Sequence, residues 1–250
     1  MLIAIISFIM VFSLVVLVHE LGHFLAARRA GVKVYEFSIG FPFSPRVLTL
    51  FRHKETEFTL RLLPLGGFVS FSKDGDEGAD DLFGTSYYNR ALIMSAGSLS
   101  NIAFAFLIFV PVFMFGKHIP FIEAVLSSFK TVWAILSGTV VVIFNIFSGN
   151  GSMEGLSGPV GIAAIAGQAA SKGLLSLAYF TGILSMSLGV MNLIPFPALD
   201  GGQLFMLVIE ALRKKPLSLK TYQTVNLIGL SLFLILTVLV TYKDITKLIA

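Results

Sequence analysis

LIAIISFIMVFSLVVLVHELGH, residues 2–23, is the stretch that decides how this chain folds. Residues 2–18 carry no charge, and about 20 mostly apolar residues are enough for a helix to cross a bilayer. The stretch then ends on two histidines and a glutamate. No basic residue precedes the apolar run and no small-residue cleavage site interrupts it, so we expect a retained membrane helix rather than a cleaved signal peptide.

The composition of the whole chain also indicates a membrane protein. Of its 250 residues, 56% are hydrophobic and 13% are charged, whereas a soluble domain is about a quarter charged and under half apolar. The chain contains no cysteine, which excludes disulfides and leaves only nitrogen and oxygen ligands for a metal. The net charge of +4 is explained by basic loops, so no nucleic-acid partner is expected.

Four segments are long and apolar enough to span a bilayer as helices. They are residues 2–26, 91–115, 175–197 and 222–242. A fifth segment, residues 131–147, is shorter and runs into the polar turn SGNGS. From its sequence it either spans, lies in the membrane interface, or packs against the other helices.

The distribution of basic residues predicts the topology. Thirteen of the 18 Lys and Arg residues lie between the first and second spans or between the third and fourth. Cytoplasmic loops carry the excess of Lys and Arg, so both connections are expected in the cytoplasm. The region between them must then cross the membrane an even number of times. We therefore expect four spans, with both chain ends outside the cytoplasm.

The first cytoplasmic connection has a pattern of its own. Residues 34–41 and 57–71 are rich in β-forming side chains and begin with alternation, so we expect them to pair as strands. Residues 74–81, DGDEGADD, lack the regular ligand spacing of a calcium loop and are expected to form a solvated turn.

The motif HELGH at the end of the first span carries chemistry. His19 and His23 are four residues apart, so on a helix they share one face and can bind one metal ion. Glu20 is placed to act as a general base toward a metal-bound water. Polar side chains are costly in lipid, and a zinc ion that takes the imidazoles as ligands would offset that cost. The alternative is a chance pattern or a polar contact between helices, which the membrane setting disfavours.

A catalytic zinc usually has three protein ligands and an open position for water. The carboxylate that fits is Asp200, in GVMNLIPFPALDGG, because the predicted topology places it on the same side as His23. The alternative is a turn in which the aspartate caps its own backbone. Pro195 and Pro197 break the helix before Asp200. Asn192 is expected either to bond the freed backbone or to contact a substrate.

With these residues placed, the sequence resembles the site-2 protease family of intramembrane zinc metalloproteases, in particular its bacterial branch that cleaves anti-sigma factors. The pairing of HELGH with NLIPFPALDGG carries the resemblance, together with LPLGGFV, AGSLSN and LSGPVGIA at residues 63–69, 96–101 and 156–163. The resemblance implies a Zn²⁺ ion bound by His19, His23 and Asp200. It also implies that Glu20 activates the attacking water.

The resemblance implies further that five residues contact the substrate or shape its channel: Gly66, Gly67, Asn192, Pro195 and Pro197. The substrates would be single-pass membrane proteins, such as anti-sigma factors or signal-peptide remnants, in a bacterial inner membrane.

The expected fold is an α-helical polytopic membrane protein with four transmembrane helices. A β-structured loop at about residues 34–71 would re-enter the membrane from the cytoplasmic side, and a short helical segment would lie at the outer face. Residues 1–116 and 173–250 would form the two halves of the protease core, and residues 117–172 would connect them.

Two departures from the family and two rival functions stay open. Ser98 stands where the family usually has proline, and the roughly forty residues between Gly116 and Leu156 are too few for the PDZ domain usual in this branch. A transporter would also place carboxylates and histidines beside a proline-broken helix, and it predicts transport without cleavage. A catalytically inactive scaffold would usually have lost the glutamate or a ligand, and all of them are present.

Overall fold

The computed structural model describes residues 2–40, 44–63, 66–72, 82, 84–149 and 157–249. The acidic turn predicted at residues 74–81 lies outside these. The described helices are α1 (Leu2–Arg29), α2 (Tyr87–Lys117), α3 (Phe121–Phe147), α4 (Pro159–Ser171), α5 (Leu174–Asn192), α6 (Asp200–Arg213) and α7 (Leu219–Ile249). The strands are β1 (Glu36–Ile39), β2 (Arg46–His53), β3 (Thr56–Arg61) and β4 (Gly67–Ser70).

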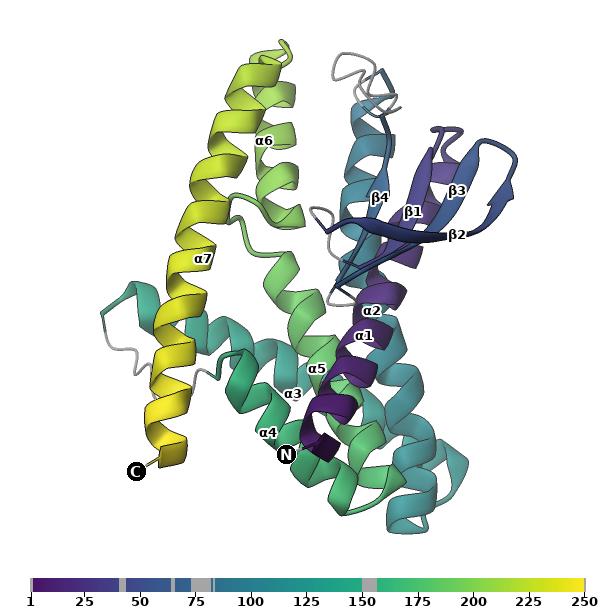
Figure 1. Ribbon diagram of the computed structural model, residues 1–250, viewed down its shortest axis with the longest axis vertical. Coiled ribbons are helices and arrows are strands. Elements are labelled where there is room, and N and C mark those ends of the chain that lie inside the picture. The colour runs from purple at the N-terminus through teal and green to yellow at the C-terminus, as the bar shows by residue number, and fades with distance from the viewer. Residues whose placement is uncertain are drawn as a thin grey trace.

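Four of the helices run along the long axis of the molecule. Figure 1 shows α1, α2, α5 and α7 in this direction, with the N- and C-termini at one end and the sheet and α6 at the other. Each of the four predicted spans lies in one of these helices, although the helix α5 ends at Asn192, five residues before the predicted end of its span. The physical reason is Pro195, which cannot continue the helix hydrogen bonding.

Five of the described helices are long and apolar enough to cross a membrane, one more than the sequence predicted. The additional helix is α3, which begins at Phe121, ten residues before the segment expected from sequence. Lys130, directly before the expected segment, lies inside the helix and does not begin it. In Figure 1, α3 runs across the direction of the other long helices, and it packs against α2 and α5.

The helix α2 packs against α1, α3, α5 and α6 and so forms the centre of the molecule. Its contact with α1 is close because Gly22 has no side chain. A Cβ atom at Gly22 would lie 2.4 Å from Oγ of Ser100 and 2.5 Å from the carbonyl oxygen of Ala96. Small residues commonly permit such close packing of membrane helices. The glycine of HELGH therefore has a structural role, which is to bring α2 up to the face that carries the two histidines.

The predicted strand pairing is confirmed, and the structure adds one strand. The sheet has the order β2-β3-β1-β4, with β1 parallel to β3 and antiparallel to β4. Both partners of β1 come from the predicted run: β4 lies within residues 57–71, and β3 begins one residue earlier, at Thr56. The strand β2 was not predicted, because its residues are all exposed and an exposed strand lacks the apolar–polar alternation of a half-buried one.

Candidate metal centre

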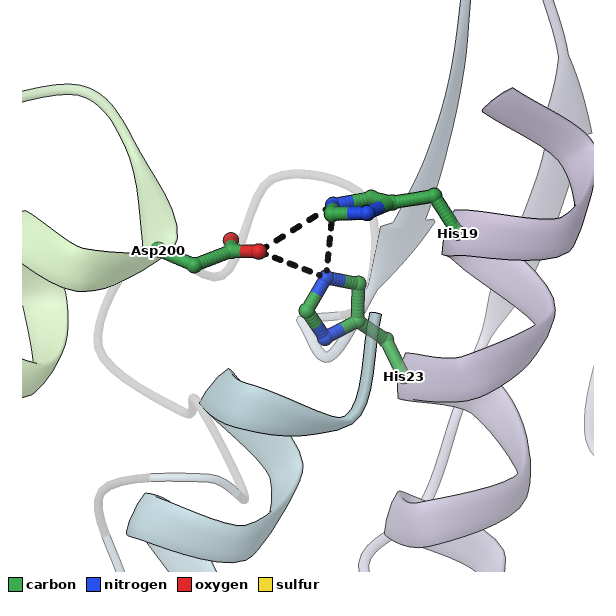
Figure 2. Close-up of side chains that lie close together, drawn as sticks. All are labelled: His19, His23 and Asp200. Carbon is green, nitrogen blue, oxygen red and sulfur yellow. Dashed lines mark hydrogen bonds and ion pairs between the residues drawn. The ribbon is translucent and has the colours of Figure 1, made fainter. Parts of the chain in front are cut away.

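The three predicted zinc ligands converge on one point. His19 and His23 project from α1, and their Nε2 atoms lie 3.2 Å apart. Oδ2 of Asp200 lies 3.1 Å from Nε2 of His19 and 3.3 Å from Nε2 of His23. Figure 2 shows the carboxylate reaching from α6 toward both rings. Both histidines are buried, so the two nitrogens and the oxygen form a triangle inside the protein. The fold brings Asp200 to the histidines although it follows His23 by 177 residues in the chain.

The local sequence explains why Asp200 reaches the histidines. Asp200 is the first residue of α6, and a short loop folds back over the first turn of that helix. A Cβ atom at Gly201 would lie 2.3 Å from the carbonyl oxygen of Ile194, and one at Gly202 would lie 2.2 Å from that of Phe196. Only glycines permit this approach. The N-cap of α6 is Leu199, which makes no side-chain cap, so the carboxylate is directed at the histidines rather than at its own backbone.

The helix α2 supplies a second layer of contacts behind the ligands. Nδ1 of His23 lies 2.7 Å from the carbonyl oxygen of Ile93, so this nitrogen donates and Nε2 keeps its lone pair. Oγ of Ser98 donates to Oδ2 of Asp200 at 3.5 Å. Such outer partners fix the tautomer and orientation of metal-binding side chains. The contacts to Ile93 and Ser98 were not predicted from the sequence, and a backbone carbonyl leaves no signal in it.

Asn101 provides a test of whether the site fits a metal. Its side-chain nitrogen faces Nδ1 of His19 at 3.4 Å, while its Oδ1 is buried and has no partner among the described residues. The oxygen and nitrogen of an amide are interchangeable in shape. Exchanging them lets Oδ1 accept a hydrogen bond from a protonated Nδ1 of His19. Nε2 of His19 is then unprotonated, like that of His23, and the donor set suits a Zn²⁺ ion.

Glu20 lies beside the ligands in a cavity of about 180 Å³. The wall combines the four polar residues of the predicted site with Gln203 of α6 and with apolar side chains from β4, α2 and the chain between them. The lining residues are His19, Glu20, His23, Phe68, Val69, Phe71, Leu82, Ile93, Met94, Asp200 and Gln203. Space is tight on the side of α2, because a Cβ atom at Gly97 would lie 2.3 Å from Nε2 of His23. The cavity therefore leaves room for a small group at the polar end and for an apolar chain along the rest.

The five predicted substrate residues lie around this cavity rather than in its wall. A Cβ atom at Gly67 would lie 2.9 Å from Cγ of Glu20, so β4 passes directly over the proposed base. Gly66 precedes β4 with a positive φ of 124°. Asn192 ends α5, and Pro195 and Pro197 lie in the loop before α6. None of the five is among the described residues that line the cavity, although Gly67 lies directly beside Glu20.

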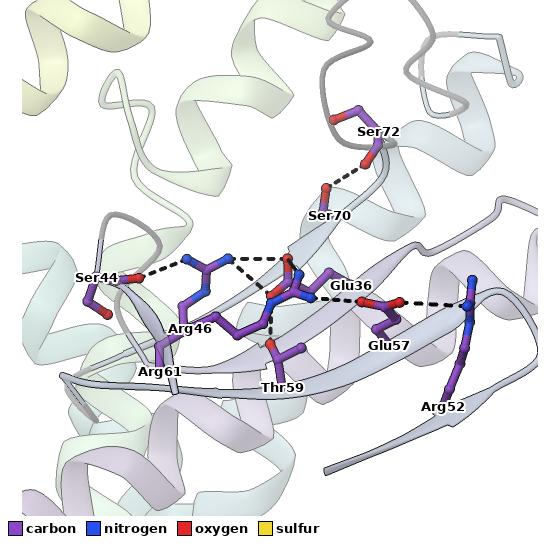
Figure 3. A network of polar contacts seen from close by, with 9 residues as sticks. All are labelled: Glu36, Ser44, Arg46, Arg52, Glu57, Thr59, Arg61, Ser70 and Ser72. Carbon is purple, nitrogen blue, oxygen red and sulfur yellow. Dashed lines mark hydrogen bonds and ion pairs between the residues drawn. The ribbon is translucent and has the colours of Figure 1, made fainter. Parts of the chain in front are cut away.

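A network of charged side chains holds the sheet that carries β4. Glu36 of β1 accepts hydrogen bonds from Thr59 at 2.6 Å and from Arg61 at 3.1 Å, both on β3. Arg46 of β2 pairs with Glu36 at 3.2 Å and with Glu57 at 2.9 Å (Figure 3). Burial opposes the charge of Arg46, but the two carboxylates outweigh it and raise the pKa of the guanidinium. The sheet is thus cross-linked from β2 through β3 to β1, which pairs with β4.

Comparison with known proteins places the chain in a family. The model of peptidase family M50 matches residues 7–236. A relative from Clostridium perfringens is 28% identical over 95% of this chain and 97% of its own length. The zinc metalloprotease RasP of Geobacillus kaustophilus is 25% identical over 98% of each chain. These alignments span 327 and 415 positions, so both relatives contain positions that the 250 residues here lack. This chain belongs to peptidase family M50.

Proposed function

We propose that this protein is a zinc-dependent intramembrane endopeptidase that hydrolyses a peptide bond in or near a transmembrane segment of its substrate. The convergence of His19, His23 and Asp200 beside Glu20 carries the proposal, because it joins a three-ligand metal site to a carboxylate that is free to act as a base. Membership of a peptidase family and relatives named zinc metalloproteases support it.

The residues divide the reaction between them. His19, His23 and Asp200 would hold the Zn²⁺ ion, which when bound supplies Lewis acidity to the scissile carbonyl and acidity to a coordinated water. Glu20 takes the proton from the attacking water and delivers it to the leaving amine. The apolar part of the cavity excludes bulk water, so these polar interactions act in a medium of low polarity.

The strand β4 is the best candidate to hold an unwound substrate. A helical substrate must open locally because its carbonyls are otherwise hydrogen-bonded. Among the described strands, β4 is paired only with β1, so its outer edge has main-chain groups that an extended peptide can pair with. Phe68 and Val69 of β4 line the metal cavity, and Gly67 leaves the main chain close to Glu20. Asn192, Pro195 and Pro197 would shape the loop that carries Asp200 rather than touch the scissile bond.

The proposed setting is a bacterial inner membrane with four spans, α1, α2, α5 and α7, and with both termini outside the cytoplasm. The positions of the Lys and Arg residues support this topology, and the direction of α3 in Figure 1 favours an outer-face helix over a fifth crossing. The sheet would then dip into the membrane from the cytoplasmic side. Single-pass membrane proteins, such as anti-sigma factors or signal-peptide remnants, are the proposed substrates.

The test combines metal analysis with a cleavage assay on the purified protein in lipid nanodiscs. We expect one zinc per chain, cleavage of a reporter transmembrane peptide, loss of cleavage on chelation and recovery on adding zinc. The Glu20→Gln variant serves as the matched inactive control. Bound zinc without any cleavage, accompanied by ion uptake into reconstituted vesicles, would establish the transporter instead.

A further inference from the structure

A second hollow of about 430 Å³ lies beside the metal cavity, between the start of α6 and the first turns of α7. Six residues line it: Ala198, Gln203, Gln223, Asn226, Leu227 and Leu230. We name it the amide groove. Gln203 lines the groove and the metal cavity alike, so the two spaces are adjacent at this side chain.

One face of α7 lines the groove. Gln223, Asn226, Leu227 and Leu230 follow the spacing i, i+3, i+4, i+7, which places them on the same helical face. The opposite face of the helix carries exposed apolar side chains, such as Ile228, which is 54% exposed. Two carboxamides on a membrane helix are costly unless something bonds to them. Both carboxamides lie on the face that lines the groove. A ligand in the groove that bonds to them would offset this free-energy cost.

One atom of the groove lacks a partner. Oδ1 of Asn226 is buried and has no hydrogen bond among the described residues. Buried polar groups are nearly always bonded in native proteins, so an exception calls for an explanation such as a missing ligand. The loop on the other wall is held in an uncommon conformation, with φ of 72° at Ala198, and it joins Pro197 to the Asp200 ligand.

The chemistry of the groove selects one class of ligand. A carboxamide both donates and accepts hydrogen bonds and carries no charge. No Lys, Arg, Asp or Glu is among the lining residues, which disfavours a phosphate headgroup or a metal cation. Three amides interleaved with leucines match a peptide main chain in extended form, with its alternating N–H and C=O groups and apolar side chains.

We infer that the amide groove binds the extended main chain of the substrate on the side of the scissile bond away from β4. This rests on the proposed proteolytic function. Figure 1 shows α6 between α7 and the sheet, so a chain that pairs with β4, crosses the metal cavity and passes Gln203 enters the groove. β4 and α7 then hold the two sides of the cleavage point, which keeps the substrate unwound between them.

Disulfide cross-linking tests this placement, because the chain has no cysteine of its own. The experiment uses Glu20→Gln protein with Asn226→Cys, and a reporter transmembrane peptide with single cysteines along its length. We expect cross-links from Asn226→Cys only to peptide positions on one side of the cleavage point. Ile228→Cys, on the opposite face of α7, is the matched control and is expected to give none. Phe68→Cys on β4 is expected to react with the other side.

The outcomes separate this inference from the proposed function. Cross-links from Phe68→Cys but none from Asn226→Cys, or equal cross-linking at positions 226 and 228, would overturn the groove while leaving a protease. In cleavage kinetics, Asn226→Leu and Gln223→Leu are each expected to raise KM about two- to tenfold, as for lost neutral hydrogen bonds, with zinc content and kcat unchanged. An unchanged KM in the double variant would also overturn it.

Discussion

Two buried polar clusters in this protein differ in how their charges are satisfied. In the first, Arg90 at the start of α2 meets Glu210 of α6 at 2.7 Å and Tyr222 of α7 at 3.0 Å. The backbone N–H of Leu217 adds a bond to Glu210 at 2.8 Å. Arg90 is 3% exposed and Glu210 is fully buried. Positive and negative charge are present together, so this cluster is closed and ties three helices to one another.

The second cluster is the candidate metal centre, and it is open. His19, His23 and Asp200 turn three electron-pair donors toward one point, with no protein cation among them. Protons shared between the rings and the carboxylate can occupy that point in the absence of a metal, but the outer contacts on Nδ1 leave both Nε2 atoms for a ligand ion. The difference teaches that a buried cluster is structural when it contains its own counter-charge and is a binding site when it does not.

The largest effect is expected from a substitution that removes the proposed general base beside the open cluster and keeps the three proposed ligands. Glu20→Gln removes the general base and is expected to lower kcat by about 10²–10⁴-fold. Because Glu20 is not a ligand in this assignment, zinc per chain and thermal stability are expected to match the parent protein. Elemental analysis and peptide cleavage on the same preparation check both. Loss of zinc at unchanged folding would show that Glu20 coordinates the ion.

The next largest effect is expected on the free energy of unfolding, when the ion pair of the closed cluster is removed. Glu210→Ala leaves Arg90 buried and unpaired, which is expected to cost about 3–5 kcal/mol of stability. Zinc per folded molecule is expected to stay the same, because the metal ligands are untouched. Unfolding in detergent, followed by circular dichroism, measures the loss.

A double variant provides the control for the closed cluster. Arg90→Met combined with Glu210→Leu removes both charges and is expected to recover part of the stability, since apolar residues often replace a buried ion pair without loss. If Glu210→Ala instead released zinc at unchanged stability, the distinction between the two clusters would not hold.

The third effect removes one donor of the open cluster. Asp200→Ala is expected to weaken zinc binding by more than about 100-fold, beyond the range seen for outer partners, and to abolish cleavage with it. Competition with a chromogenic chelator measures the affinity. Ser98→Ala, which removes only the 3.5 Å contact to the same carboxylate, is the control and is expected to keep most of the zinc. Full zinc occupancy in Asp200→Ala would require a ligand from elsewhere in the chain.

The convergence of the three proposed ligands was predictable because their residue types are scarce in apolar sequence. His19 and His23 were identified by their spacing of four residues on one helix. Asp200 was identified because a catalytic zinc usually requires a third protein ligand. The carbonyl of Ile93 was not predictable, because its place behind His23 depends on how closely α2 approaches α1. Asn101 did carry a signal, since an asparagine within an apolar span needs a buried partner.

Some elements of the fold were also predictable from the sequence, and others were not. The long spans and the strand partners of β1 follow from apolar length and alternation. The helix α3 was predicted too short because the expected segment began directly after Lys130. A charge at a helix surface does not end the helix. The strand β2 was missed because all its side chains are exposed, so its place in the sheet comes from backbone pairing with β3 and not from a buried face.

The smallest expected effect sharpens the comparison at the outer layer of the open cluster. Asn101 is fully buried, and its only role in this assignment is to accept a hydrogen bond from Nδ1 of His19. Asn101→Leu keeps the approximate volume but removes the acceptor, and it is expected to weaken zinc binding about 10–100-fold. Asn101→Asp keeps an acceptor oxygen at the same place and is expected to retain more zinc than the leucine variant at equal folding. If both variants bound zinc as tightly as the parent protein, the tautomer of His19 would be set by something other than Asn101. If both lost it equally together with stability, the amide would belong to the structural class of cluster, as Arg90 and Glu210 do.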